Sequence, residues 1–170
     1  RVGYVPEKHH MYDWMSVQQV LEFAAGLYPR WSWQECEQLN EILDLPLDRK
    51  VKELSRGEQA KLALIVALAH RPKVLILDEP TSGLDPISAT QFDELVRYLG
   101  DNLDLTIVMI THDVDSLFGV CDRVAVLVNK GIIVDTVDEI VKHPDPWIQE
   151  YFGDPRAVRA RRAAKAKVNT

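Results

Sequence analysis

One stretch, residues 75–85 with the sequence LILDEPTSGLD, constrains the fold of this chain most strongly. Its apolar run ends in two adjacent carboxylates, Asp78 and Glu79. Short apolar runs bounded by turn residues are typical of buried parallel strands. Ligands of open α/β sheets bind beyond the carboxyl ends of such strands, where a carboxylate can hold the Mg²⁺ that bridges nucleotide phosphates. The stretch therefore predicts an α/β fold with Mg²⁺-nucleotide chemistry at one sheet edge.

The rest of the chain alternates strand and helix patterns, which also favours an α/β fold. The predicted strands are residues 2–5, 74–77, 105–110, 123–128 and 132–135, with a hairpin turn at 129–131. The predicted helices are residues 16–28, 32–43, 56–70, 86–99, 114–119, 137–142 and 146–152. We expect one domain over residues 1–153, with a helical subdomain at about residues 12–70.

Composition limits the remaining classes. A chain of 170 residues with 46% hydrophobic residues can build a core. No apolar run approaches the roughly 18 residues of a membrane span, and no signal peptide is visible. Cys36 and Cys121 lack metal-ligand spacing and suit a reducing compartment. Because the chain begins at Arg1 and enters a strand-like run at once, we interpret it as a fragment whose N-terminal part is missing.

The segment 154–170 holds six Lys or Arg residues against one acid, although the whole chain carries −6. We expect a basic, disordered tail that frays into solvent. The alternative is attraction to anionic lipid headgroups or to an acidic partner.

Three further features accompany the strand-end acids. Ser55 and Glu58 fit a capping box before the third predicted helix, and Gly57 leaves that helix N-terminus bare enough for a phosphate to approach. His112 follows the strand 105–110, so we expect it at the same sheet edge, where it can donate to a γ-phosphate. Asp85 caps the helix that begins at Pro86.

Residues 54–59, 74–80, 82–85 and 111–113 resemble, in order and spacing, the signature motif, Walker B, D-loop and H-loop of an ABC transporter ATPase. Residues 2–7 resemble the strand that leads to the Q-loop of that family. The resemblance extends to Phe152 and implies a P-loop NTPase-like ABC ATPase domain. It also implies ATP and Mg²⁺ as cofactors.

The resemblance assigns roles at the strand end. Asp78 would be the carboxylate on the Mg²⁺ side and Glu79 the catalytic base. His112 would contact the γ-phosphate. Glu7, at the Q-loop position, would lie near Mg²⁺, although the family usually has Gln there.

The signature motif would serve a second nucleotide. Ser55 and Gly57 would contact the γ-phosphate of ATP held by the opposite subunit, with Arg56 and Glu58 in the same nucleotide-binding motif. Arg56 replaces a glycine of the usual pattern. Asp85 would help to couple the two sites.

The decisive departure is the phosphate loop. None of the eight glycines is followed by Lys, so the sequence contains no G-x-x-x-x-G-K-[ST]. We predict that these residues alone neither bind ATP tightly nor hydrolyse it. We also expect aggregation or partial order in isolation, because strands that read as buried on both faces would lose neighbours.

The resemblance implies transmembrane permease subunits as partners, a second ATPase subunit in a head-to-tail dimer, and no nucleic acid. The chain would be peripheral to the cytoplasmic face of a bacterial inner membrane. Residues 11–17 and 54–57 resemble antibiotic-resistance-type exporter ATPases, whereas residues 86–89 and 145–152 resemble the Mla-type phospholipid or toluene-tolerance ATPase. A hybrid with its junction near residues 81–86, and a role in lipid transport, follow as expectations.

Three other functions remain open. A DNA-maintenance ATPase of the SMC type shares these motifs, but only residues 7–54 separate the Q-loop position from the signature, without heptads. A soluble translation-factor ATPase would need a second cassette. A non-catalytic fragment or interaction module is the strongest rival, because the phosphate loop is missing.

Overall fold

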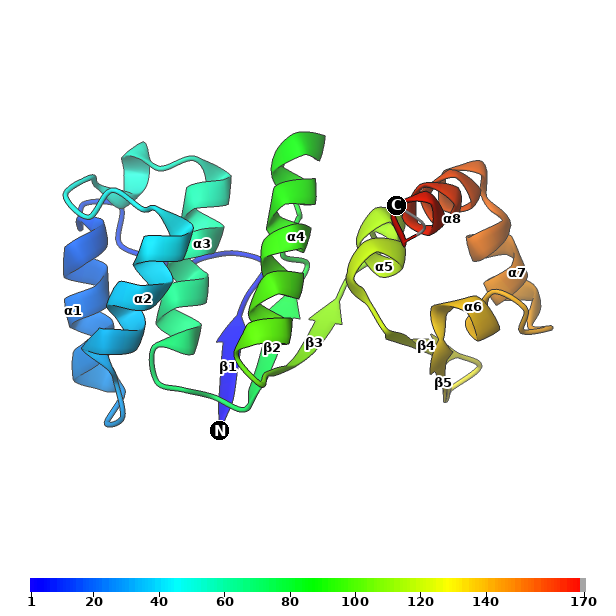
Figure 1. The fold of residues 1–170 in the computed structure, drawn as a ribbon, viewed down its shortest axis with the longest axis horizontal. Coiled ribbons are helices and arrows are strands. Elements are labelled where there is room, and N and C mark those ends of the chain that lie inside the picture. Colours follow the sequence, from blue (N-terminus) through cyan, green and yellow to red (C-terminus); the bar gives the residue numbers. More distant parts are fainter. Residues whose placement is uncertain (169–170) are drawn as a thin grey trace. The chain divides into compact units, whose positions relative to one another are not determined.

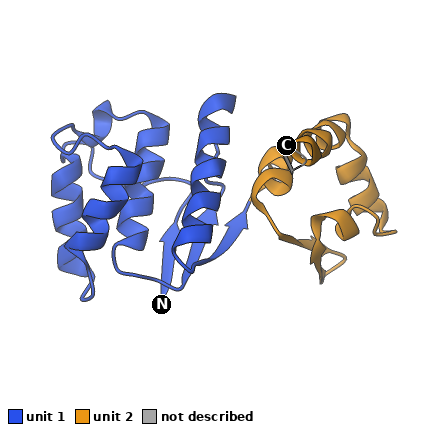
Figure 2. Cartoon of the chain, in the orientation of Figure 1, with its two compact units in different colours: residues 1–110 blue, residues 111–170 orange. Residues whose placement is uncertain are grey.

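The computed structural model describes residues 1–168 of the chain (Figure 1). These residues form two compact units, one over residues 1–110 and one that begins at Thr111 (Figure 2). The single domain predicted over residues 1–153 stays a prediction. Among the described residues, no helix is both long enough and apolar enough to cross a membrane.

A three-stranded parallel sheet forms the centre of the first unit. Its order is β1 (Val2–Val5), β2 (Val74–Asp78) and β3 (Thr106–Ile110). One face of the sheet is closed, since Val5, Leu75 and Leu77 are fully buried. Gly3 allows α3 to approach β1 closely, because a Cβ there would lie 2.5 Å from the carbonyl oxygen of Ala67.

The helices of the first unit are α1 (Val17–Leu27), α2 (Trp33–Leu43), the short 3₁₀ helix η1 (Val51–Glu53), α3 (Arg56–Leu68) and α4 (Pro86–Asn102). The second half of α3 is buried on nearly all sides, which explains the apolar run at residues 62–68. The helix α3 packs against α1, α2 and α4 (Figure 1). Ser16 caps α1 and Ser32 caps α2, each through its side-chain oxygen.

The other face of the sheet is open. It carries Val2, Tyr4, Val108 and Ile110, whose exposed fractions are 54%, 54%, 46% and 53%. The sequence predicts that the apolar residues of β1 and β3 on this face are buried, because parallel strands are normally covered on both faces. The open face therefore agrees with the expectation that the chain exposes apolar sheet surface.

The second unit contains α5 (Val114–Val120), the antiparallel hairpin β4 (Arg123–Val128) and β5 (Gly131–Thr136), α6 (Val137–Ile140), α7 (Pro146–Gly153) and α8 (Pro155–Val168). The hairpin was predicted. Asn129 and Lys130 adopt φ values of 51° and 60°, as a tight two-residue hairpin turn requires. Leu117, Val126 and Ile148 belong to the core of this unit.

Where the sequence predicted a disordered tail, the structure has the helix α8. Ala157 and Ala160 are buried, and α8 contacts α5 and α7. Small residues three apart give a helix one apolar stripe, and counting charges over the segment overlooked this stripe. The basic residues Arg156, Arg159 and Arg162 are exposed. Residues 169–170 of the predicted tail lie outside the described residues.

An acidic residue on α6 anchors this basic helix. Asp138 accepts from Arg161 at 2.9 Å and pairs with Lys165 at 3.1 Å. The side-chain hydrogen bonds from Arg161 and then Lys165 lower the pKa of Asp138. We expect Asp138→Asn to reduce the free energy of unfolding by about 0.5–1 kcal/mol, because both pairs are solvent-accessible.

This loss is measured by urea unfolding at low and high salt. The difference between wild type and Asp138→Asn should shrink in high salt. The difference in stability should also shrink below about pH 3.8. The lowered pKa of Asp138 means that its ionised carboxylate stabilises the fold, and this stabilisation is lost as the carboxylate is protonated. Glu150→Gln, at an exposed position of α7, is the matched control and should leave stability unchanged. A salt-independent loss would contradict the ion-pair account.

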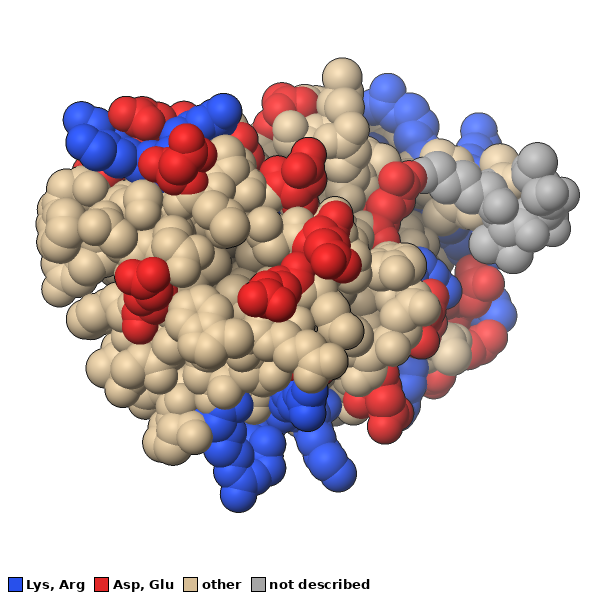
Figure 3. Space-filling view, turned by 60° about the vertical axis from the view of Figure 1, so that its left-hand side comes forward, with Lys and Arg blue, Asp and Glu red and all other residues tan. Residues whose placement is uncertain are grey.

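On the face shown in Figure 3, Asp and Glu side chains lie among wide uncharged areas, and Lys and Arg gather toward its edges.

Exposed large apolar side chains of the first unit include Tyr12, Trp14 and Phe23, at 55%, 61% and 49% exposure. Tyr12 contacts both of the other rings, with centroid distances of 5.9 Å to Trp14 and 6.1 Å to Phe23. These three residues are called the aromatic cluster below.

Candidate nucleotide site

The strand β2 ends at the two adjacent carboxylates. Asp78 is the last residue of β2, and Glu79 turns the chain with φ of 44°. The N–H of Glu79 donates to the carbonyl oxygen of Ile110 at 2.8 Å, which fixes this turn against the end of β3. A non-glycine residue in this region costs about 1–3 kcal/mol, and such conformations concentrate at functional sites.

The Q-loop position lies at the same edge of the sheet. The hydroxyl of Ser82 donates to Glu7 Oε1 at 3.4 Å, and the N–H of Ser82 donates to the carbonyl oxygen of Glu79 at 3.0 Å. Both predicted residues, Glu7 and Glu79, therefore contact Ser82 in the turn that follows β2. Their proposed roles toward Mg²⁺ and water stay predictions.

Sequence reasoning missed one contact of Asp78. The hydroxyl of Tyr4 donates to Asp78 Oδ2 at 3.1 Å. Tyr4 lies opposite Ile76 in the β1–β2 pair, so Asp78 is its diagonal neighbour on the same face. The contact follows from the strand register, because two parallel strands in this register place the side chains of Tyr4 and Asp78 on the same face of the sheet.

The carboxylates at the end of β2 suit a hydrated metal ion better than an ion whose ligands all come from the protein. Among residues 1–168, no group of three or more His, Cys, Asp or Glu side chains is arranged to hold a metal ion. Mg²⁺ in nucleotide sites keeps several waters and takes one or two carboxylates together with phosphate oxygens. Asp78 at the strand end, with Glu79 next to it, fits that requirement.

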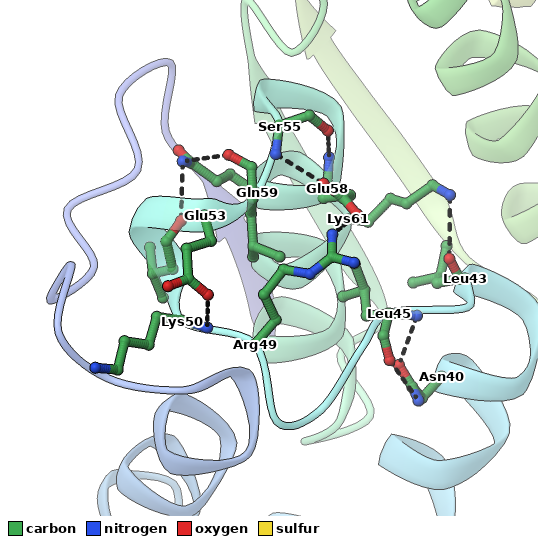
Figure 4. Close-up of polar contacts among 12 residues, drawn as sticks. Asn40, Leu43, Leu45, Arg49, Lys50, Glu53, Ser55, Glu58, Gln59 and Lys61 are labelled. Carbon is green, nitrogen blue, oxygen red and sulfur yellow. Dashed lines mark hydrogen bonds and ion pairs between the residues drawn. The ribbon is translucent and has the colours of Figure 1, made fainter.

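The predicted capping box is present at the N-terminus of α3 (Figure 4). Ser55 Oγ accepts from the N–H of Glu58 at 3.2 Å, and the N–H of Ser55 donates to Glu58 Oε2 at 2.7 Å. Arg49 pairs with Glu58 Oε1 at 3.2 Å. The hydrogen bond from the Ser55 backbone is the main cause that lowers the pKa of Glu58.

Further hydrogen bonds tie this helix start to its surroundings. The side chain of Gln59 donates to the carbonyl oxygens of Val51 and Leu54, both at 3.3 Å, and Lys61 donates to that of Leu43 at 3.0 Å (Figure 4). By contrast, a Cβ at Gly57 would meet nothing within 4 Å. Packing within the chain therefore does not require a glycine at this position, whereas close approach of a ligand would.

The cap gives a stability prediction. We expect Ser55→Ala to lower the free energy of unfolding by about 1 kcal/mol, because the N–H of Glu58 loses its side-chain acceptor. Ser55→Asp retains a capping oxygen and should keep most of that stability, while its charge would oppose a phosphate. Urea unfolding of the three proteins measures the effect.

The pH dependence of this cap follows from Glu58. Because the pKa of Glu58 is lowered in the folded protein, its ionised carboxylate contributes to the free energy of unfolding. This contribution is fully present above the ordinary pKa of 4.5 and is lost as pH falls through the folded-state pKa. Wild type and Ser55→Ala should therefore both lose this contribution below about pH 4.5, because the backbone N–H of residue 55 that holds the Glu58 carboxylate is present in both proteins. An equal loss of stability in Ser55→Ala and Ser55→Asp would contradict the capping role.

Arg56, which departs from the usual signature pattern, reaches the turn before α4. Its Nη1 donates to the carbonyl oxygen of Gly83 at 3.4 Å. Gly83 adopts φ of 73°, and a Cβ there would collide with the Arg56 guanidinium. The guanidinium therefore links the signature motif to the predicted D-loop within one chain.

Asp85 has the structural role that the sequence predicted. Its Oδ1 accepts from the N–H groups of Ile87 and Ser88, each at 3.0 Å, at the start of α4. The side-chain hydrogen bond from Ser88 is the main cause that lowers the pKa of Asp85. A role in coupling two nucleotide sites stays a prediction.

His112 belongs to the second unit, where its carbonyl oxygen accepts from the Tyr151 hydroxyl at 2.9 Å. Its side chain is exposed. The expected position of His112 beside Asp78 and Glu79 therefore stays a prediction.

Known proteins match this chain over most of its length. Residues 1–82 match the family model described as ABC transporter. The chain is 32% identical over 169 residues to the glycine betaine/carnitine/choline transport ATP-binding protein OpuCA of Bacillus subtilis, covering 95% of this chain and 44% of that protein. It is 36% identical over 166 residues to the sulfate/thiosulfate import ATP-binding protein CysA of Methylococcus capsulatus, covering 91% of this chain and 47% of that protein.

A solved structure supports the fold. An inward-facing metal-chelate type ABC transporter matches with a TM-score of 0.73 at 21% identity, over 82% of this chain and 59% of that chain. The predicted α/β fold of an ABC ATPase domain is confirmed, and residues 1–82 match the ABC transporter family. Its curated relatives are ABC transporter ATPases, and the chain spans less than half the length of those described above.

Proposed function

We propose that this chain is part of the ATP-hydrolysing, energy-coupling subunit of an ABC membrane transporter. The observation that carries the proposal is the end of β2, where Asp78 closes the strand and Glu79 turns away from it with a strained backbone. The capped N-terminus of α3, with open space at Gly57, supports a second phosphate contact.

The residues would divide the reaction as follows. Asp78 would hold the hydrated Mg²⁺ ion of bound ATP, and Glu79 would orient and polarise the attacking water as general base. Bound Mg²⁺ would neutralise charge that develops on the phosphates. His112 would donate to the γ-phosphate.

The signature residues would act on the nucleotide of a second subunit. Ser55 and the N–H groups at the start of α3 would meet its γ-phosphate, since a helix N-terminus favours anions. Arg56 would add positive charge there, and Glu58 would keep the capping box closed. A head-to-tail dimer follows, because each site then needs the α3 N-terminus of the other copy. Asp85 would help to couple the two sites through α4.

Permease subunits would be the other partners, with the chain peripheral on the cytoplasmic face of the membrane. The aromatic cluster supports a protein contact on the helical subdomain, because grouped exposed aromatic side chains mark interaction surfaces. The names of the relatives concern transport of betaine, carnitine, choline and sulfate, so these comparisons lend no support to the predicted lipid transport.

ATP turnover by the complete gene product, with Mg²⁺ present, tests this function. Hydrolysis that disappears on Glu79→Gln supports it, and hydrolysis that persists contradicts it. For residues 1–170 alone, a non-catalytic interaction module remains the second candidate, because this sequence contains no phosphate-binding loop.

A further inference from the structure

Tyr4 is placed beside the proposed magnesium carboxylate by the register of the sheet. Tyr4 pairs with Ile76, and Asp78 follows two residues later on the same face. The phenol lies along this diagonal, and its hydroxyl donates to Asp78 Oδ2 at 3.1 Å. The contact joins residues 74 positions apart in the sequence.

The hydroxyl is well suited to hold a carboxylate. The ordinary pKa of a tyrosine phenol is about 10, so the hydroxyl is a donor at neutral pH. Hydrogen bonds to an ionised acceptor are stronger than neutral ones, and such a bond restricts rotation of the carboxylate.

Packing within the described residues does not account for the contact. Tyr4 is 54% exposed and lies on the open face of the sheet, whereas the buried face of β1 is made by Gly3 and Val5. A phenylalanine would provide the same ring on this face. The hydroxyl is the part of Tyr4 that the contact with Asp78 uses.

We propose that Tyr4 is a positioning residue for the nucleotide-bound Mg²⁺ ion. By holding Oδ2 of Asp78, the Tyr4 hydroxyl leaves Oδ1 as the oxygen that meets a water of the hydrated ion. Tyr4 touches neither metal nor nucleotide and acts through Asp78. This inference rests on the proposed function of the strand end.

The test separates binding of the metal from binding of the nucleotide. It uses the complete gene product with Glu79→Gln in every sample, so that hydrolysis does not interfere. The affinity for a fluorescent ATP analogue is measured in EDTA and then across a Mg²⁺ titration. With the further change Tyr4→Phe, we expect the Mg²⁺ concentration at half effect to rise about tenfold, as is typical when a ligand loses its outer hydrogen bond.

The affinity in EDTA and the thermal midpoint should stay unchanged in Tyr4→Phe, because the ring is kept. Tyr98→Phe is the matched control, since it removes a hydroxyl from an exposed tyrosine on α4. It should leave the Mg²⁺ titration as it is.

Two results would overturn the inference. A Mg²⁺ midpoint within a factor of about two of the Glu79→Gln parent would show that the hydroxyl does not position Asp78. A loss of affinity already in EDTA would show that Tyr4 acts on the nucleotide or on the fold. If the parent itself shows no effect of Mg²⁺ on nucleotide affinity, the proposed function fails, and the inference fails with it.

Discussion

Glu79→Gln is expected to reduce ATP turnover by the complete gene product about 10²- to 10⁴-fold, the usual contribution of a positioned general base. The amide has nearly the same shape as the carboxylate but cannot accept a proton from the attacking water. Turnover is measured as phosphate release at saturating ATP and Mg²⁺.

The structure explains why the effect should be confined to chemistry. Glu79 stands outside β2, in a turn held by its own backbone N–H to Ile110, so exchange of the side chain leaves the turn intact. Unfolding stability should therefore stay close to wild type. Glu41→Gln, at an exposed position of α2, is the matched control and should turn over ATP normally.

Residues 1–170 by themselves are expected to show neither tight ATP binding nor turnover. The carboxylates of β2 and the α3 N-terminus are in place, but the cradle for the β- and γ-phosphates requires a glycine-rich loop with its lysine, and this sequence has none. Isothermal titration with ATP and Mg²⁺ should detect no site of micromolar affinity, and phosphate release should match the background.

The complete gene product, measured under the same conditions, shows whether a phosphate loop supplied elsewhere restores the site. A more controlled comparison fuses the loop-bearing N-terminal part of a relative to residues 1–170, with and without its lysine changed to alanine. Turnover that depends on this lysine would support the account. Turnover by residues 1–170 that stops on Glu79→Gln would contradict it, because the chain would then hold a nucleotide by means not seen in its sequence.

Much of the first unit follows from local sequence patterns. The ends of the predicted elements differ from the observed ones by three residues or fewer. Ser16, Ser32 and Ser55 begin helices because a side-chain oxygen can satisfy an exposed N–H in each case. The apolar runs of β2 and β3 predicted buried parallel strands, and the structure pairs them with each other and with β1.

Features that depend on distant pairs were harder to predict. The contact between Tyr4 and Asp78 needs the register of two strands that are remote in sequence. Arg161 and Lys165 of α8 pair with Asp138 on another element, which the composition of the segment alone cannot show. The link from Arg56 to Gly83 likewise depends on how α3 and the turn before α4 come together.

The fate of ATP bound to the Glu79→Gln form of the complete gene product tests the central claim most directly. The protein is loaded with radiolabelled ATP and Mg²⁺, passed through a desalting column and denatured, and the nucleotide is identified. The account predicts that intact ATP is recovered and that the wild type yields ADP. Recovery of ADP from Glu79→Gln at the wild-type rate would contradict the assignment of the β2 strand end as the hydrolytic site.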